Sequence, residues 1–171
     1  MWNFVKRSTT GWYPGITMSS FKPKNQFPEL PHLKGNHYQT TIRHGLLLQE
    51  EGVLVIPDFQ RGLVWTTEQK VRFIESLVTG LPIGEYTIHY DNKTPKYELL
   101  DGQQRWNAIF SYVNGEFEVF GLKWSDLNKD SVYVFSNTQF PYREITGLTE
   151  EQKLDVYNRL AYGGTPHEIP T

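Results

Sequence analysis

One stretch of ten residues decides how this chain is expected to fold: Tyr97-Glu98-Leu99-Leu100-Asp101-Gly102-Gln103-Gln104-Arg105-Trp106. Its first four residues are mostly apolar and predict a strand, while Gly102 permits a backbone turn that other residues resist. Beyond the turn, apolar side chains recur with the spacing of one helix face, at Trp106, Ile109, Phe110 and Val113. The stretch therefore predicts a strand, a sharp polar turn and the opening of a helix.

The same turn gathers groups that suit phosphate chemistry. The first turn of a helix carries free N–H groups and a partial positive charge, and both favour an anion there. The turn adds one acid, two amides and a permanent cation, namely Asp101, Gln103, Gln104 and Arg105. We predict that it binds phosphate and helps to break a phosphoester. A structural alternative stays open, in which Asp101 caps the helix and Arg105 pairs with a surface acid.

Helices and short strands interleave along the rest of the chain. We expect helices at 37–51, from Thr66 or Thr67 to Gly80, and from a Thr149–Gln152 capping box to Gly163. Strands are expected at 53–56, in a hairpin of 85–90 and 96–100, and at 117–120, 132–135 and 140–145. This order predicts an α+β fold with a small mixed sheet and flanking helices.

Composition narrows the classes of protein to consider. The 171 residues suit one domain with a sizeable core, and the absence of cysteine excludes disulfides, thiolate zinc sites and thiol catalysis. The sequence contains no run of about 18 apolar residues, so no membrane span is predicted. Neither a P-loop, a Gly-x-Gly-x-x-Gly motif nor a His-Glu-x-x-His motif occurs. We expect a cytoplasmic protein with no membrane partner.

The net charge of −2 hides an asymmetry between the two parts of the chain. Residues 1–49 carry a net charge of +5, and the remainder carries −7. Residues 1–36 are also rich in proline, glycine and aromatic side chains, which predicts an extended arm followed by a single domain at 37–171. A basic arm with aromatics can follow a nucleic-acid backbone, although packing against protein is an alternative.

Three blocks of sequence carry a family resemblance, which covers roughly residues 37–168. The first is Ile56-Pro57-Asp58-Phe59-Gln60-Arg61-Gly62-Leu63-Val64-Trp65, with the helix that leads to Leu81-Pro82-Ile83-Gly84; the second is Leu100-Asp101-Gly102-Gln103-Gln104-Arg105; the third is Asn158-Arg159-Leu160-Ala161-Tyr162-Gly163-Gly164-Thr165-Pro166. The chain resembles the N-terminal domain of GmrSD-type restriction endonucleases, within the wider ParB/sulfiredoxin-like superfamily.

The resemblance implies a ParB-like fold whose two polar loops meet at a nucleotide site. Carried over by position, Gln60, Arg61, Gly102 and Arg105 would bind nucleotide phosphates. Asp101, Gln103, Gln104 and Arg105 would be the catalytic residues, with Asp101 also holding a divalent ion, Mg²⁺ being the expected one. A structural alternative gives Arg61 an ion pair with Asp58 or Asp101.

The function expected from the resemblance is that of a nucleotide-dependent phosphohydrolase or nuclease-like domain, linked to DNA restriction or counter-defence. A nucleoside triphosphate would be the ligand or substrate, DNA would contact the basic arm, and a protein partner or a second copy of the chain is also allowed. The family usually has Asn where Ala161 stands. If that Asn serves the site, this chain is instead a non-catalytic module that senses a nucleotide or DNA, or a subunit of a larger complex.

Overall fold

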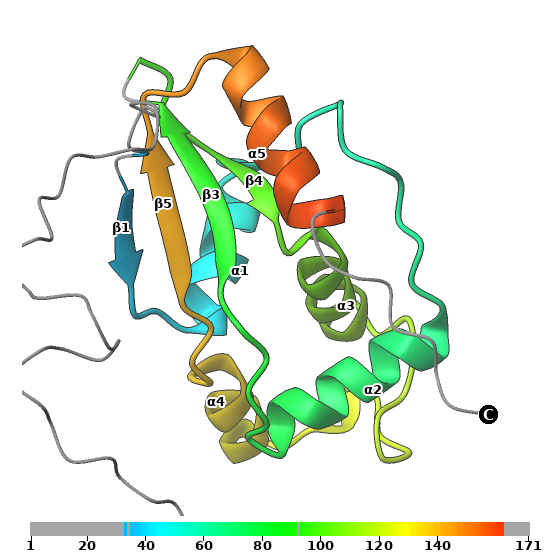
Figure 1. Cartoon of the computed structure of the whole chain (residues 1–171). Helices are drawn as coiled ribbons and strands as arrows, with labels where there is room; N and C mark the ends of the chain where they lie inside the picture. The colour runs from blue at the N-terminus through cyan, green and yellow to red at the C-terminus, as the bar shows by residue number, and fades with distance from the viewer. Residues whose placement is uncertain (1–32, 34, 92, 163–171) are drawn as a thin grey trace, which may run out of the picture. The chain divides into compact units, whose positions relative to one another are not determined.

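The computed structural model describes residue 33, residues 35–91 and residues 93–162 (Figure 1). The expected arm at 1–36 thus lies almost wholly outside the described residues, and the boundary at 36/37 stays a prediction. Within the described part of the chain, no helix is long and apolar enough to cross a bilayer.

Five strands form one mixed sheet with the order β1-β5-β3-β4-β2. They are β1 (Gly35–Tyr38), β2 (Leu54–Val55), β3 (Tyr86–Asp91), β4 (Lys96–Asp101) and β5 (Tyr142–Thr146). The pairs β1–β5 and β3–β4 are antiparallel, whereas β3–β5 and β2–β4 are parallel. The predicted α+β class with a small mixed sheet is confirmed.

Helices cover both faces of this sheet. They are α1 (Ile42–Glu50), α2 (Thr67–Val78), α3 (Gln103–Val113), α4 (Lys129–Ser136) and α5 (Glu150–Tyr162), with a short 3₁₀ turn, η2 (Trp124–Asp126). Neighbouring residues of a strand point to opposite faces. Accordingly, Leu99 of β4 packs in the large core with α1, α2 and α3, whereas Leu100 packs in a small cluster with Val156 of α5.

Close packing of aromatic side chains fixes α3 against the sheet and α1. The Trp106 side chain is fully buried, and its ring makes an edge contact with Tyr86 of β3 at a centroid distance of 5.2 Å. A Cβ at Gly45 of α1 would stand 1.9 Å from the Trp106 ring, so only glycine allows this approach. The face of α3 that was predicted to be buried is thus confirmed at Trp106 and Ile109.

Helix starts were largely predictable from capping residues. The Thr66 hydroxyl accepts a hydrogen bond from Gln69 N, and the Gln69 side chain accepts one from Thr66 N, which completes a capping box. The same reciprocal pair joins Thr149 and Gln152 at the start of α5. Each box satisfies backbone N–H groups that the first turn leaves without partners.

Two predicted strands and the start of one predicted helix were wrong. Residues 37–38 belong to β1, which pairs with β5, so the helix begins only at Ile42. Residues 132–135 lie in α4, because Asn128 caps the helix by accepting from Ser131 N at 2.8 Å. Residues 117–120 form no strand, and only an isolated bridge joins Val119 to Leu122. In the last two cases, a composition typical of strands led to the wrong prediction. In the first case, pairing with the distant strand β5 decided the structure.

Candidate functional site

The residues predicted to form the site line one cavity of about 210 Å³. Three segments that are far apart in the sequence contribute to it. They are Gln60, Arg61 and Trp65 of the loop 57–65, residues 100–105 at the junction of β4 and α3, and Tyr157, Leu160 and Ala161 of α5. The fold therefore brings the first and second sequence blocks together, with α5 as a third wall.

The junction between β4 and α3 depends on Gly102. This residue is the N-cap of α3 and has a φ of +102°, in the region that favours glycine. A Cβ at this position would stand 2.7 Å from Cβ of Tyr86, so the backbone must also approach β3 closely. Asp101 therefore does not cap α3. The first N–H groups of α3 are left without partners inside the helix, and residues 103–105, which carry them, line the cavity.

Asp101 and Arg105 neutralise each other across the first turn of α3. Arg105 Nη2 lies 2.6 Å from Asp101 Oδ2, and Arg105 Nη1 donates to the carbonyl of Ile83 at 2.9 Å. The guanidinium also lies over the Phe140 ring, 5.6 Å from its centroid. Burial lowers the pKa of Arg105, and the attraction of Asp101 only partly offsets that effect. Arg105 thus joins α3 to the segment before β3 and is not a free surface cation.

Gln104 holds the loop 57–65 against α3. Its Oε1 accepts hydrogen bonds from Val64 N at 3.0 Å and Trp65 N at 3.2 Å, and its Nε2 donates to the carbonyl of Gly62 at 3.2 Å. The amide group therefore uses both ends on loop backbone. This geometry gives Gln104 a structural task beside the catalytic role predicted for it.

Two further contacts hold the same loop from other directions. Gln60 Nε2 donates to the carbonyl of Leu99 on β4. Arg61 N donates to the Tyr157 hydroxyl on α5 at 3.0 Å. The backbone around Arg61 is therefore attached to β4, α3 and α5 by neutral groups.

The side chains of Arg61 and Gln103 also line the cavity, but their contacts differ from those of Gln104 and Arg105. Within the described residues, no hydrogen bond or ion pair engages either of these side chains. The alternative ion pair of Arg61 with Asp58 or Asp101 is thus not formed there, since Asp101 pairs with Arg105. Arg61 is exposed, and its positive charge remains available to a ligand.

The donor set does not fit a metal ion held by the protein alone. Among the residues that the structure describes, no group of three or more His, Cys, Asp or Glu side chains could hold one. Among the described residues, Asp101 is the one carboxylate that lines the cavity, and one of its oxygens is engaged by Arg105. The predicted Mg²⁺ would need most of its ligands from elsewhere.

A charged cluster attaches α5 to the sheet and so sets the third wall. Lys153, only 4% exposed, places Nζ 2.6 Å from Glu98 Oε2 of β4 and 2.6 Å from Glu150 Oε1. Buried His89 places Nδ1 2.8 Å from the same Glu98 oxygen, while its Nε2 accepts from Leu148 N at 3.3 Å. An Nε2 that accepts carries no proton, so the proton lies on Nδ1 and is donated to Glu98.

Sequence reasoning missed this cluster. His89 was correctly expected to have a core or surface role, but nothing in the spacing of residues 89, 98 and 153 links them. Tyr157 was recognised only as part of an apolar helix face, and its hydroxyl contact with Arg61 depends on how α5 packs. A lysine at a position expected to be buried needs an acidic partner. That requirement is the one signal in the sequence that can suggest such a cluster.

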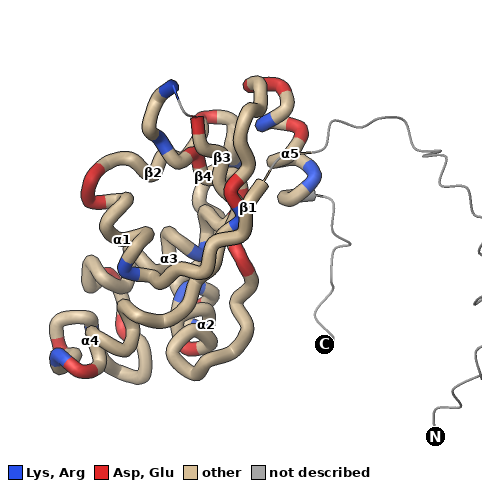
Figure 2. Tube along the Cα trace, turned by 90° about the vertical axis from the view of Figure 1, so that its left-hand side faces the viewer, with Lys and Arg blue, Asp and Glu red and all other residues tan. Residues whose placement is uncertain are grey.

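Charges of both signs are interspersed along the described part of the chain (Figure 2). The predicted DNA contact relied on the basic N-terminal arm, which lies almost wholly outside the described residues. It therefore stays a prediction.

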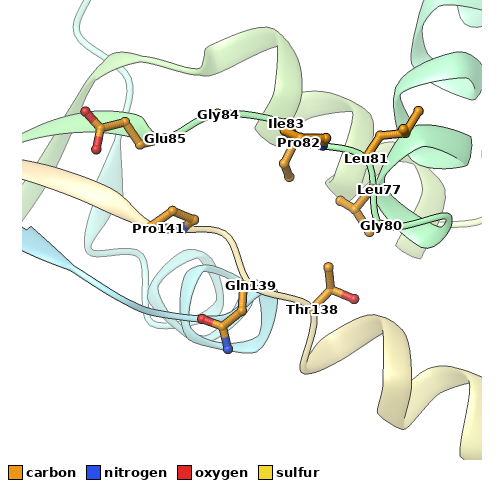
Figure 3. A pocket seen from close by; sticks show the side chains of 10 residues that line it. All are labelled: Leu77, Gly80, Leu81, Pro82, Ile83, Gly84, Glu85, Thr138, Gln139 and Pro141. Atoms are coloured by element: carbon orange, nitrogen blue, oxygen red, sulfur yellow. The ribbon is translucent and has the colours of Figure 1, made fainter. Parts of the chain in front are cut away.

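A larger cavity of about 510 Å³ lies between residues 80–85 and residues 138–141, which face each other in Figure 3. The described residues that line it are mostly apolar. They include one carboxylate, Glu85, which already lies 3.0 Å from His37 Nδ1 and 3.8 Å from Arg143 Nε. Size alone thus does not mark the site. The smaller cavity is the candidate, because it combines the first turn of α3 with Arg61, a cation that has no partner in the part of the chain that the structure describes.

Comparison with known proteins places the chain in a family. An uncharacterized protein of Methanocaldococcus jannaschii is 27% identical over 144 residues, covering 62% of this chain and 24% of that protein. The chain thus spans about a quarter of that relative's length. The C-terminally truncated chromosome-partitioning protein ParB from Caulobacter crescentus, solved with CTP-γ-S, gives a TM-score of 0.44 at 11% identity, covering 77% of this chain and 56% of that chain. At this score the likeness supports no statement about the ligand of this chain.

The family assignment rests on residues 44–163, which match the model of the GmrSD restriction endonuclease N-terminal domain. This range is more than half of the chain and contains both polar segments of the cavity, the loop 57–65 and residues 100–105. The resemblance noted in the sequence blocks is confirmed. The chain belongs to the GmrSD N-terminal domain family.

Proposed function

We propose that this domain binds a nucleotide by its phosphates in the cavity between the loop 57–65 and the start of α3. The observation that carries the proposal is the state of Arg61. Its side chain lines the cavity without a partner among the described residues, while Gln104 and Tyr157 hold the loop backbone around it. A cation that is held in position but not neutralised is suited to binding phosphate.

The rest of the cavity complements such a ligand. The first N–H groups of α3 offer donors and the positive end of the helix dipole. Arg61, Arg105 and Asp101 together leave one net positive charge in the lining. In this proposal Arg105 and Gln60 act mainly by positioning, since Arg105 is paired with Asp101 and Gln60 with the Leu99 carbonyl.

Hydrolysis of the nucleotide is a second candidate, and one observation favours it. Arg105 contacts Asp101 at Oδ2, which leaves Oδ1 of a side chain that is 39% exposed and lines the cavity. That oxygen can accept a hydrogen bond from an attacking water, and the Gln103 amide can orient the same water. Without turnover, the domain is a nucleotide sensor, and Ala161 in the lining is in keeping with that outcome.

The family gives this activity a setting. We infer that nucleotide binding is linked to DNA restriction or counter-defence, because the chain belongs to a family of restriction endonuclease domains. The contact with DNA is assigned to the basic arm at 1–36. A divalent ion, if used, is expected to arrive with the nucleotide.

Thermal shift measurements test the binding proposal. We would follow the melting temperature with ATP, GTP, CTP and UTP at millimolar concentration, with and without Mg²⁺. A ligand that binds only the folded state raises that temperature by mass action. We expect one triphosphate to raise it, and Arg61→Ala to remove the shift.

Arg43→Ala is the matched control, since Arg43 is exposed on α1 and lies outside the cavity lining. The proposal is wrong if no triphosphate shifts the melting temperature, or if both variants lose the shift equally.

A second experiment, the release of phosphate from the bound triphosphate, separates hydrolysis from sensing. Loss of release in Asp101→Asn, with binding retained, supports hydrolysis, and absence of release from the wild type rejects it.

A further inference from the structure

A strained turn at residues 119–122 displays a large apolar side chain beside a hollow. Val119 N donates to the Leu122 carbonyl at 3.0 Å, and Leu122 N donates back to the Val119 carbonyl at 3.0 Å. Phe120 and Gly121, between them, have φ values of +52° and +74°. Two central residues with positive φ are typical of a type I′ turn, which favours Asn-Gly.

Phenylalanine is an unfavourable choice for this turn. A bulky residue with positive φ is an outlier, and such strain persists where the surroundings or a function retain it. Among the described residues other than glycine, Phe120 alone has a positive φ. Its side chain is nevertheless 65% exposed, so packing within the domain does not account for it.

The turn borders a hollow of about 380 Å³ between α4 and the end of α2. Four exposed apolar residues line it, Val78, Phe120, Leu122 and Val134, over a floor that includes Phe135. We call this set of four the turn patch. Large apolar side chains around a hollow are typical of a protein interaction site, because their burial removes apolar surface from water.

We propose that the turn patch is a self-association surface, in which Phe120 of each copy enters the hollow of the other. A two-fold interface brings one patch against itself, so it needs a projection and a recess side by side. Phe120 supplies the projection, and the hollow beside it supplies the recess. The proposal does not depend on the nucleotide site.

The charges at the edge of the patch favour a second copy over a partner of one charge sign. Asp130 lines the hollow, and Lys123 follows Leu122 directly; both are exposed. Neither of the two side chains forms an ion pair within the described residues. Figure 2 likewise shows basic and acidic segments next to each other at α4. Across a two-fold axis, Lys123 can pair with the partner subunit's Asp130, and the same contact occurs twice.

The test is the oligomeric state of the full chain, measured by light scattering and sedimentation over a wide concentration range. We expect a concentration-dependent dimer, with Phe120→Asn weakening the association about tenfold or more. Asn tolerates positive φ, so the melting temperature of the dilute protein should rise by a few degrees. A variant that is more stable yet fails to dimerise separates association from folding.

Tyr133→Asn is the matched control, because Tyr133 is 67% exposed on α4 but does not line the hollow. It should leave the dimer intact. If Phe120→Asn fails to fold, Val134→Lys takes its place, since Val134 is 66% exposed on a helix surface. A wild type that stays monomeric throughout overturns the proposal, as does equal dimerisation of the patch variants and Tyr133→Asn.

Discussion

Strand β4 and the loop 57–65 border the same cavity, but they are held in place by different kinds of contact. From β4, Asp101 pairs with Arg105 of α3, and Glu98 pairs with Lys153 of α5, so charged pairs attach both helices. The loop is attached by neutral groups, the amides of Gln60 and Gln104 and the hydroxyl of Tyr157.

The charged pairs of β4 hold the walls of the cavity in place, whereas the loop 57–65 carries Arg61, the side chain proposed to contact a ligand. Arg105 and Lys153 are the mostly buried partners of these pairs, so removing the acid from either pair is costly, because it leaves a poorly solvated cation. Neutral hydrogen bonds near the surface cost less to open, since water can replace them. We therefore expect the β4 side to be rigid, with its attachment to α5 sensitive to acid through Glu98, and the loop to be more easily released.

The largest effect on folding is expected from Arg105→Leu. The substitution removes the ion pair with Asp101, the hydrogen bond to the Ile83 carbonyl and the contact with the Phe140 ring. We expect the free energy of unfolding to fall by about 2–4 kcal/mol, measured by urea denaturation. Asp101→Asn should cost less, because its amide oxygen can still accept from Arg105. Equal stability of Arg105→Leu and wild type would show that the β4 side is not held as described.

The second largest effect is expected from acid, which should weaken the attachment of α5 to β4. Burial raises the pKa of Glu98, but hydrogen bonds from Lys153 and His89 outweigh it, and the net pKa is lowered from 4.5. A carboxyl group whose pKa is lower in the folded state than in the unfolded state stabilises the folded state at every pH above its unfolded pKa. This stability is lost as the pH falls from the unfolded pKa through the folded pKa.

Glu98→Gln tests this attachment directly. At neutral pH it should lower the free energy of unfolding by about 1–3 kcal/mol and flatten the acid side of the stability curve. Glu118→Gln is the control, as Glu118 is exposed and lies outside the cluster. Identical acid profiles for Glu98→Gln and wild type would contradict the role of this cluster.

Gln104→Ala should have a smaller effect on stability and a local effect on the loop. Three hydrogen bonds to the loop backbone are lost, but water can reach Val64 and Gly62, so we expect about 1–2 kcal/mol. Amide exchange at Val64 and Trp65 should become faster at every pH. Gln103→Ala should leave that exchange unchanged, and a similar acceleration in both variants would argue against Gln104 as the group that holds the loop.

Arg61→Ala should have the smallest effect on folding. The side chain is exposed and has no partner among the described residues, so the free energy of unfolding should change by less than about 0.5 kcal/mol. The thermal shift caused by nucleotide should nevertheless disappear. A marked loss of stability would mean that Arg61 is a structural residue, and the comparison between β4 and the loop would then fail.

Much of the local structure followed from neighbouring residues. The turn at Gly102 was predicted from residue type, and the capping boxes at Thr66 and Thr149 mark the observed starts of α2 and α5. Strand β1 was mistaken for the start of a helix, because its pairing with β5 involves residues about 100 positions away. Helix α4 was mistaken for a strand, since a run of β-branched and aromatic residues suits either structure.

The sequence by itself determined the family, the α+β class and the set of polar residues around Gly102, because motifs, caps and apolar spacing act over a few neighbouring positions. The tertiary structure alone decided how those polar groups are divided. It paired Arg105 with Asp101, committed Gln104 to the loop and left Arg61 free among the described residues. A side chain's chemistry limits the bonds that it can form, but the packing of distant segments decides which partners come within reach.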